Sequence, residues 1–248
     1  MIITSAELVS DFVSLSRKAL GRYLEDMGLL IYSSAATLHQ GNPVMYWGFN
    51  PGQDPRAEDE THWKICEAIS RFPNQKSSLI DDQDWPNARS GLVEEGGHKK
   101  YKCRHEKGKA PYQRGVHHLL EFIGHPGALV ANFVFFQTRR EGDLGLTKEE
   151  VDSCWQVHTF LFKATRARVV ITTKGVVNSI RRFGLMNLEE LDTRDSGYSN
   201  WKMSLFKNEK GPAVIAAPHM SYWGPCVADG KSECALNWIK KSVDRFVR

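Results

Sequence analysis

Three polar side chains of the sequence each follow an apolar run that is typical of a buried strand. An Asn side chain carries both a hydrogen-bond donor and an acceptor, and a His side chain can donate, accept or transfer a proton. If the strands are parallel neighbours, these groups meet at the edge of the sheet where α/β proteins bind ligands. The residues are Asn50 after Val44–Trp47, Asn132 within Ala128–Phe136, and His219 after Ala213–Ala217.

Strands alternate with amphipathic helices along the chain, which predicts an α/β protein with a parallel sheet covered on both faces. Two capping boxes, Thr4–Glu7 and Thr147–Glu150, each predict the start of a helix. Besides the three runs above, Arg168–Thr173 is expected to be a strand. The other expected helices are 62–72, Gly115–Ile123, Gly175–Phe183 and Ala235–Val247.

Residues 74–111 form a polar, Gly-containing stretch without helix or strand periodicity. We expect this stretch to be a long insertion in a single domain that spans residues 1–248. Loops of this length are usually functional or mobile. Basic residues crowd the insertion, which is typical of a solvated loop and also of a surface that binds nucleic acid. They are Lys99, Lys100, Lys102, Arg104, Lys107 and Lys109, and Arg139 with Arg140 adds a separate basic pair.

The composition is that of an ordinary globular protein, with 41% hydrophobic and 25% charged residues and a formal net charge of +4. The sequence shows neither an apolar run of about 20 residues nor a signal peptide, so we expect a cytoplasmic protein without a membrane span. The five cysteines are scattered, which predicts free thiols and no metal site. The mild positive charge permits a nucleic-acid partner without requiring one.

Motifs at these strand ends resemble those of the uracil-DNA glycosylase superfamily. Gly48-Phe49-Asn50-Pro51-Gly52 is similar to the first motif of its mismatch-specific and single-strand-selective branches, Gly-x-Asn-Pro-Gly. Pro218-His219-Met220-Ser221 is similar to the second motif, His-Pro-Ser. The segment from Tyr112 to Asn132 resembles the part in which an aromatic ring stacks on the base and an Asn reads it. The resemblance runs over most of the chain and implies a three-layer sandwich around a central, mainly parallel four-stranded sheet.

A second motif overlaps the first, because Gly52-Gln53-Asp54-Pro55 repeats the letters of the bacterial repair branch, in which the Asp is catalytic. The register decides between the two. The superfamily motif follows its strand directly, and Val44–Trp47 leads straight into Gly48. We therefore assign the catalytic position to Asn50, and Asp54 becomes a helix cap or a nearby acid.

The resemblance implies that the protein is a monomer that removes a base from DNA, with water as the nucleophile and without a metal or cofactor. Asn50 would orient the water, and His219 would stabilise the departing base by a hydrogen bond. Asn132 would pair with the edge of a flipped-out pyrimidine, and Tyr112, or else Phe72, would stack on it. The base-binding loop would include Gly48, Phe49 and Gly52, and the DNA-binding residues would be Arg139, Arg140 and Ser221 together with Tyr222 or Trp223 as a wedge.

Gly52 departs from the repair branch, where a Tyr at this place blocks substituents at ring position five of the base. An open pocket would admit uracil or a pyrimidine substituted at that position, and Met220 in place of the usual Pro is a further departure. One alternative is a bacterial defence enzyme that excises modified cytosine from phage DNA. The others are a DNA-binding protein without catalysis and a hydrolase of small nucleosides.

Overall fold

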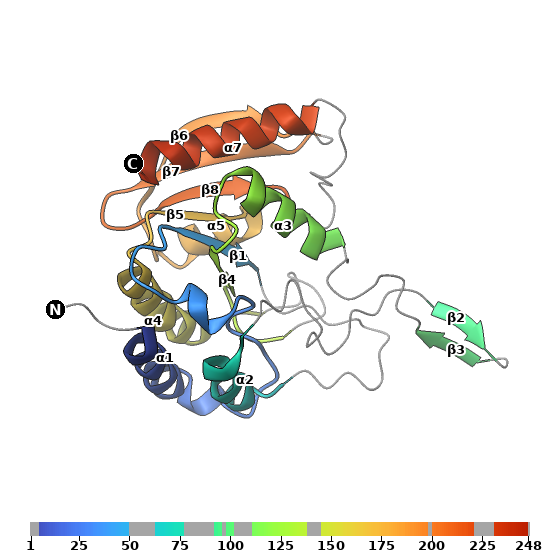
Figure 1. The fold of residues 1–248 in the computed structure, drawn as a ribbon, viewed down its shortest axis with the longest axis vertical. Coiled ribbons are helices and arrows are strands. Elements are labelled where there is room, and N and C mark those ends of the chain that lie inside the picture. Colours follow the sequence, from blue (N-terminus) through green and yellow to red (C-terminus); the bar gives the residue numbers. More distant parts are fainter. Residues whose placement is uncertain are drawn as a thin grey trace.

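The computed structural model has a central sheet of six strands in the order β4-β1-β5-β8-β7-β6. The structure describes residues 5–49, 63–76, 92–95, 98–101, 111–137, 145–197, 200–220 and 231–247. Four strands are parallel neighbours, and β7 and β6 extend the sheet as an antiparallel hairpin beyond β8 (Figure 1). The strands are β1 (Val44–Gly48), β4 (Leu129–Asn132), β5 (Val169–Thr173), β6 (Leu188–Asp195), β7 (Lys202–Asn208) and β8 (Ala213–Ala217).

Helices pack against both faces of the sheet, as neighbouring residues of β1 show. The ring of Tyr46 lies 6.3 Å from that of Tyr112 in α3, whereas the ring of Trp47 lies 4.4 Å from that of His158 in α4. Successive side chains of a strand point to opposite faces, so α3 and α4 cover opposite sides of β1. The helices are α1 (Ser5–Ala19), α2 (Ile65–Arg71), α3 (Pro111–Phe122), α4 (Lys148–Thr165), α5 (Lys174–Arg182) and α7 (Lys231–Val247), with short 3-10 turns at Gly21–Tyr23, Ala35–Thr37 and Phe72–Asn74.

The predicted parallel strands are confirmed, but the prediction of a four-stranded sheet is wrong. The missing pair is the β6–β7 hairpin. Most residues of β6 are exposed and polar, so this edge strand carries no apolar periodicity from which it could be predicted. β7 alternates more clearly between buried and exposed positions.

The apolar run 128–136 forms a strand only as far as Asn132. Beyond it, the chain stays buried because residues 27–31 cross over it and take up its hydrogen bonds. The amide of Leu29 donates to the carbonyl of Phe135 at 3.0 Å, for example. Apolar character therefore predicted burial correctly, whereas the end of the strand depends on a segment about a hundred residues earlier in the chain.

The insertion also contains more regular structure than its sequence predicted. Within the described residues, β2 (Leu92–Glu95) and β3 (His98–Tyr101) form an antiparallel pair that makes a separate two-stranded sheet. Charged residues on both strands hide the pairing from an analysis of hydrophobic periodicity.

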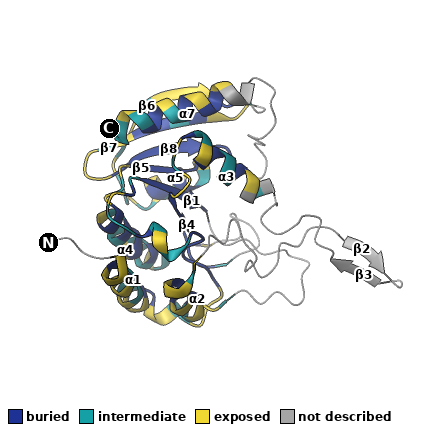
Figure 2. Ribbon diagram, in the orientation of Figure 1, coloured by how far each residue is buried: buried dark blue, intermediate teal, exposed yellow. Residues whose placement is uncertain are grey.

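Local sequence determines the helix ends where capping residues are present. The Thr147 hydroxyl accepts a hydrogen bond from the amide of Glu150, whose carboxylate accepts one from the Thr147 amide, so the predicted capping box is formed. α3 begins at Pro111, earlier than predicted, because proline is well tolerated at the first helical position. Every residue of β1, β4, β5 and β8 is buried, and these strands are dark blue in Figure 2. No helix in the described ranges has the length and apolar character needed to cross a membrane.

His158 of α4 is buried in an aromatic cluster behind β1 and β4. Its ring lies within 6.1 Å of the rings of Trp47, Phe133 and Phe135, and its Nε2–H donates to the carbonyl oxygen of Phe133 at 2.9 Å. Burial lowers the pKa of His158 to about 4. The imidazole is therefore neutral at pH 7, and a charged ring in this cluster would oppose folding.

We expect the protein to lose stability in mild acid because of His158. Between the ordinary histidine pKa of about 6.5 and the folded value, the unfolded chain binds the proton more readily, so the free energy of unfolding falls as the pH falls. The loss attributable to His158 is about 3 kcal/mol at most. Urea unfolding from roughly pH 7.5 to pH 4.5 measures it, with the non-titrating variant His158→Gln as the control. Parallel pH profiles for the two proteins would contradict the assignment.

Candidate functional site

The carboxyl ends of β1 and β4 bring two of the predicted site residues together. Gly48 and Asn132 are paired in register across these parallel strands. A Cβ atom on Gly48 would lie 3.0 Å from both Asn132 Oδ1 and the Tyr112 hydroxyl oxygen, which is tighter than ordinary contact. Only a glycine at the end of β1 lets both side chains approach the backbone so closely. The strand-end argument thus correctly predicted that this edge of the sheet gathers polar groups.

The side-chain amide of Asn132 has a defined orientation. Asn132 is 1% exposed, and its Nδ2 atom lies 2.9 Å from the carbonyl oxygen of Leu29. Since a carbonyl can only accept a hydrogen bond, the amide nitrogen must face Leu29. The oxygen Oδ1 then lies on the side of Gly48 and Tyr112. Asn132 therefore presents an acceptor to the site, which suits a ligand that carries a donor.

Three tyrosines contribute to this part of the structure: Tyr32 is hydrogen-bonded to Asn132, Tyr112 approaches Gly48, and the ring of Tyr46 lies 6.3 Å from that of Tyr112. Burial raises the pKa values of Tyr32, Tyr46 and Tyr112, so all three phenols are neutral donors at pH 7. A hydrogen bond with the Asn132 side chain partly opposes the rise in the pKa of Tyr32. The Tyr46 hydroxyl makes no well-formed hydrogen bond within the described residues, and its pKa responds to the Tyr112 hydroxyl beside it.

His219 joins the site from β8. It follows the strand by two residues, and its ring stacks on that of Tyr112 with the centroids 5.4 Å apart and the planes at 28°. Burial lowers the pKa of His219, so the imidazole is neutral at pH 7. Tyr112 thus connects α3, the end of β1 and the loop after β8 in one cluster of neutral hydrogen-bonding groups.

Gly115 allows α3 to pack closely against the loop that carries His219. A Cβ atom at this position would lie 2.8 Å from the backbone oxygen of Met220, a distance that real Cβ atoms essentially never show. Met220 itself is buried. The glycine therefore positions Tyr112, one turn earlier in α3, beside His219.

The remaining site predictions divide into two groups. The side chain of Phe49 is buried with its ring 6.2 Å from that of Phe133, and Phe72 is buried with its ring 4.9 Å from that of Phe12. Both rings therefore pack in the core. The other predicted residues lie outside the described residues: Asn50, Gly52, Asp54, Arg139, Arg140, Ser221, Tyr222 and Trp223.

Tyr32 and Tyr46 were missed by the sequence analysis. Tyr46 lies inside an apolar run, where a tyrosine reads as an ordinary core residue. Tyr32 lies in an irregular segment whose contact with β4 has no signature in the sequence. Proximity to a predicted strand end could have singled out Tyr46 alone.

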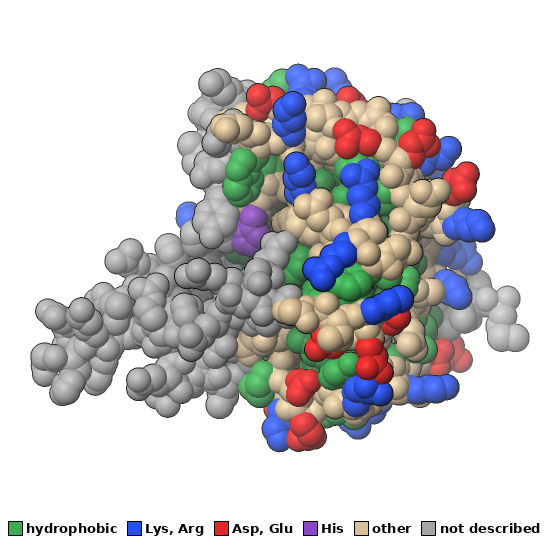
Figure 3. All heavy atoms as spheres, turned by 180° about the vertical axis from the view of Figure 1, so that it is seen from behind, with side chains coloured by type: hydrophobic (Ala, Val, Ile, Leu, Met, Phe, Trp, Pro, Cys, Tyr) green, Lys and Arg blue, Asp and Glu red, His purple; other side chains and the backbone are tan. Residues whose placement is uncertain are grey.

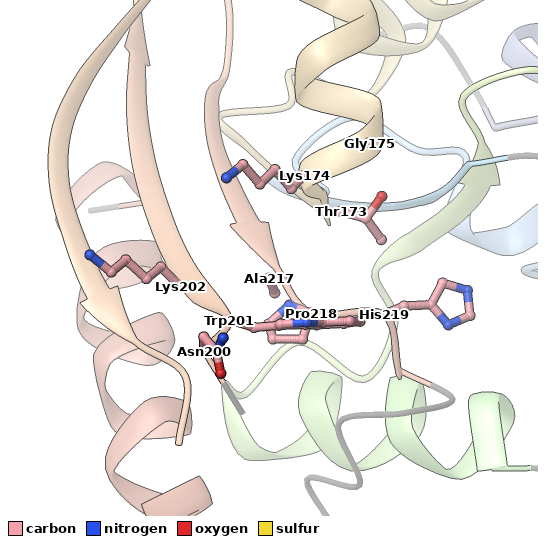
Figure 4. A pocket seen from close by; sticks show the side chains of 9 residues that line it. All are labelled: Thr173, Lys174, Gly175, Asn200, Trp201, Lys202, Ala217, Pro218 and His219. Atoms are coloured by element: carbon pink, nitrogen blue, oxygen red, sulfur yellow. The ribbon is translucent and has the colours of Figure 1, made fainter. Parts of the chain in front are cut away.

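A cavity of about 420 Å³ is lined in part by His219. Figure 4 shows Lys174 and Lys202 on one side of it and His219 on the opposite side, with Trp201 and Pro218 between them.

On the face shown in Figure 3, the described Lys and Arg side chains are scattered among Asp and Glu, so this face is not a continuous basic surface. Among the residues that the structure describes, no group of three or more His, Cys, Asp or Glu could hold a metal ion.

Comparison of the sequence with protein-family models gave no match, and comparison with curated proteins found no similar sequence.

Proposed function

We propose that this protein is a monofunctional DNA glycosylase that flips a pyrimidine out of DNA and hydrolyses its N-glycosidic bond. The base is uracil or a pyrimidine substituted at ring position five, the product is an abasic site, and the protein acts as a monomer. The proposal combines the α/β fold with the motifs that resemble those of uracil-DNA glycosylases. It assigns the parallel strands and their helices to the three-layer sandwich of that superfamily, with the β6–β7 hairpin as an addition.

The observation that carries the proposal is the convergence of Asn132, Tyr112 and His219 at the end of β1. Tyr112 and Asn132 belong to one segment that resembles the superfamily, Gly48 at the end of β1 belongs to the first motif, and His219 belongs to the second. A chance match of short motifs would not require their side chains to meet at one edge of a sheet. The cluster is also neutral and largely buried, as suits the recognition of an uncharged base in a water-poor site.

The reaction divides between the sugar and the base. The bond between the sugar C1′ atom and the ring nitrogen breaks, and its electron pair leaves with the base. The oxygen of water bonds to C1′, and the proton that this water loses passes to solvent, from which the departing base anion takes up a proton. Asn50 orients the water through its amide oxygen, since a neutral amide is not a strong base. The neutral imidazole of His219 donates to the base as negative charge develops on it. Asn132 Oδ1 accepts from an N–H of the base, and Tyr112 offers the face that His219 does not cover.

Base release by matched variants tests the proposal. The substrates are oligonucleotides with uracil or with cytosine enlarged at ring position five, together with phage DNA that contains modified cytosine. We expect wild-type protein to release a base and Asn50→Ala to lose this activity. Asp54→Ala is the matched control, because the overlapping motif would make Asp54 the catalytic residue instead.

Each outcome has a definite meaning. Release of uracil indicates repair, whereas release of enlarged cytosines alone indicates defence against phage. Loss of activity in Asp54→Ala but not in Asn50→Ala would reverse the assignment of the two motifs. DNA binding without release of a base from any substrate would overturn the proposal in favour of a binding protein, and release from free nucleosides alone would favour the small-molecule hydrolase.

A further inference from the structure

The proposed reaction assigns no role to the cavity beside His219. Its volume of about 420 Å³ falls within the range of small-molecule sites, roughly 300–1,000 Å³. Its walls come from the carboxyl ends of β5 and β8, the first turn of α5 and the start of β7 (Figure 4). The β6–β7 hairpin, which the resemblance did not predict, therefore builds one side of it.

Trp201 supplies an aromatic wall to this cavity. The residue is 42% exposed, and in the described part of the chain only Met27 is another large hydrophobic residue with comparable exposure. In Figure 4 its ring extends from the start of β7 toward Pro218 and His219. An exposed ring on the wall of a cavity is a platform for a planar ligand. Any of the nucleobases can stack on such a ring, because each has an aromatic face.

Two lysines, whose positive charge suits an anion, also line this cavity. Lys174 and Lys202 are exposed at the same cavity, one at the first position of α5 and the other at the first position of β7. Thr173 precedes α5 at the N-cap position, yet its side chain makes no capping hydrogen bond. Its hydroxyl is buried and has no partner among the described residues. Together with the amides of the first turn of α5, these groups suit a phosphate.

We infer that this cavity binds a nucleotide, with its base on Trp201 and its phosphate near Lys174, Lys202 and Thr173. A nucleotide of the DNA strand next to the flipped-out one is the source that we favour, because His219 is a wall of the cavity and also stacks on Tyr112. That choice of source rests on the proposed function. A free mononucleotide shares the same chemistry and is the other source.

Equilibrium binding of labelled single-stranded DNA, about 15 nucleotides long, tests the inference. We expect Trp201→Ala to weaken binding roughly 5- to 150-fold, the loss of one base–aromatic stack, and Trp201→Phe to retain most of the affinity. Lys202→Gln should lower the slope of log affinity against log salt by roughly one phosphate contact. Lys207→Gln, at an exposed position farther along β7, should leave that slope unchanged. Thermal unfolding of each variant shows that the fold is intact.

Competition with free mononucleotides separates the two sources. Displacement of DNA at concentrations near the affinity of the whole strand would identify the cavity as a mononucleotide site. If neither DNA affinity nor mononucleotide affinity changes in Trp201→Ala, the inference is overturned, as it is if the wild-type protein binds neither DNA nor mononucleotides. Binding that depends on Trp201 without any base release would sustain the inference and overturn the glycosylase proposal, so the two failures are distinct.

Discussion

Replacing His219 with alanine is expected to lower the rate of base release by about 100- to 1,000-fold, with DNA affinity changed only a few-fold. The departing base gains negative charge only as its bond to the sugar breaks, so a donor to that base acts mainly on the transition state. Single-turnover measurements with saturating protein separate the chemical step from binding.

The state of the His219 imidazole adds a second expectation. Burial lowers its pKa, so the ring is neutral at pH 7 and stays neutral as the pH falls toward the ordinary histidine value of about 6.5. The contribution of His219 to the rate should therefore be constant between roughly pH 7 and pH 8. His219→Gln keeps a neutral donor and should recover part of the lost rate.

A matched control for this prediction is His118→Ala. His118 lies on α3, as Tyr112 does. Its ring contacts that of Phe122, which is not a site residue, at a centroid distance of 6.3 Å. We expect its replacement to leave the rate of base release unchanged. Equal rates in wild type and His219→Ala would remove His219 from the mechanism, and an equal loss in His118→Ala would indicate a general effect on α3.

Replacing Asn132 with alanine is expected to reduce base release by at least about 100-fold, because the site loses the acceptor that pairs with the base. Stability should fall as well. The change leaves the buried carbonyl of Leu29 without the amide donor, at a cost of about 1–3 kcal/mol. A loss of activity alone could therefore reflect unfolding.

Asn42 offers a control for that ambiguity. It is also a buried asparagine, and its Nδ2 atom donates to the carbonyl oxygens of Thr37 and Gly127 at 2.8 and 3.0 Å. It lies at the opposite end of β1 from Gly48. We expect Asn42→Ala to lower the urea midpoint by a similar amount while base release per folded molecule is unchanged. Equal activity losses in both variants would mean that Asn132 acts through stability alone.

The parallel core of the fold was predictable from the sequence because its signals are local. β-Branched and aromatic runs bounded by turn residues predicted β1, β5 and β8, and capping residues predicted the start of α4. The parallel order of the strands followed from their alternation with helices, which also predicted that Asn132 and the end of β1 would meet. The exposed, polar edge strand β6 had no such signal, and its hairpin with β7 was missed.

Only the tertiary structure decided how the site groups face one another. The Leu29 carbonyl turns the Asn132 amide, the absence of a side chain at Gly115 lets α3 approach Met220, and Trp201 reaches the cavity from the unpredicted hairpin. Each of these contacts joins residues that are distant in the chain, and close packing defines their geometry. The sequence by itself thus predicted that Asn132 and His219 lie at the carboxyl ends of parallel strands, whereas it missed Tyr32 and Tyr46. The orientation and protonation of these groups, and the cavity lined by His219, depend on burial and on long-range contacts, which no local pattern encodes.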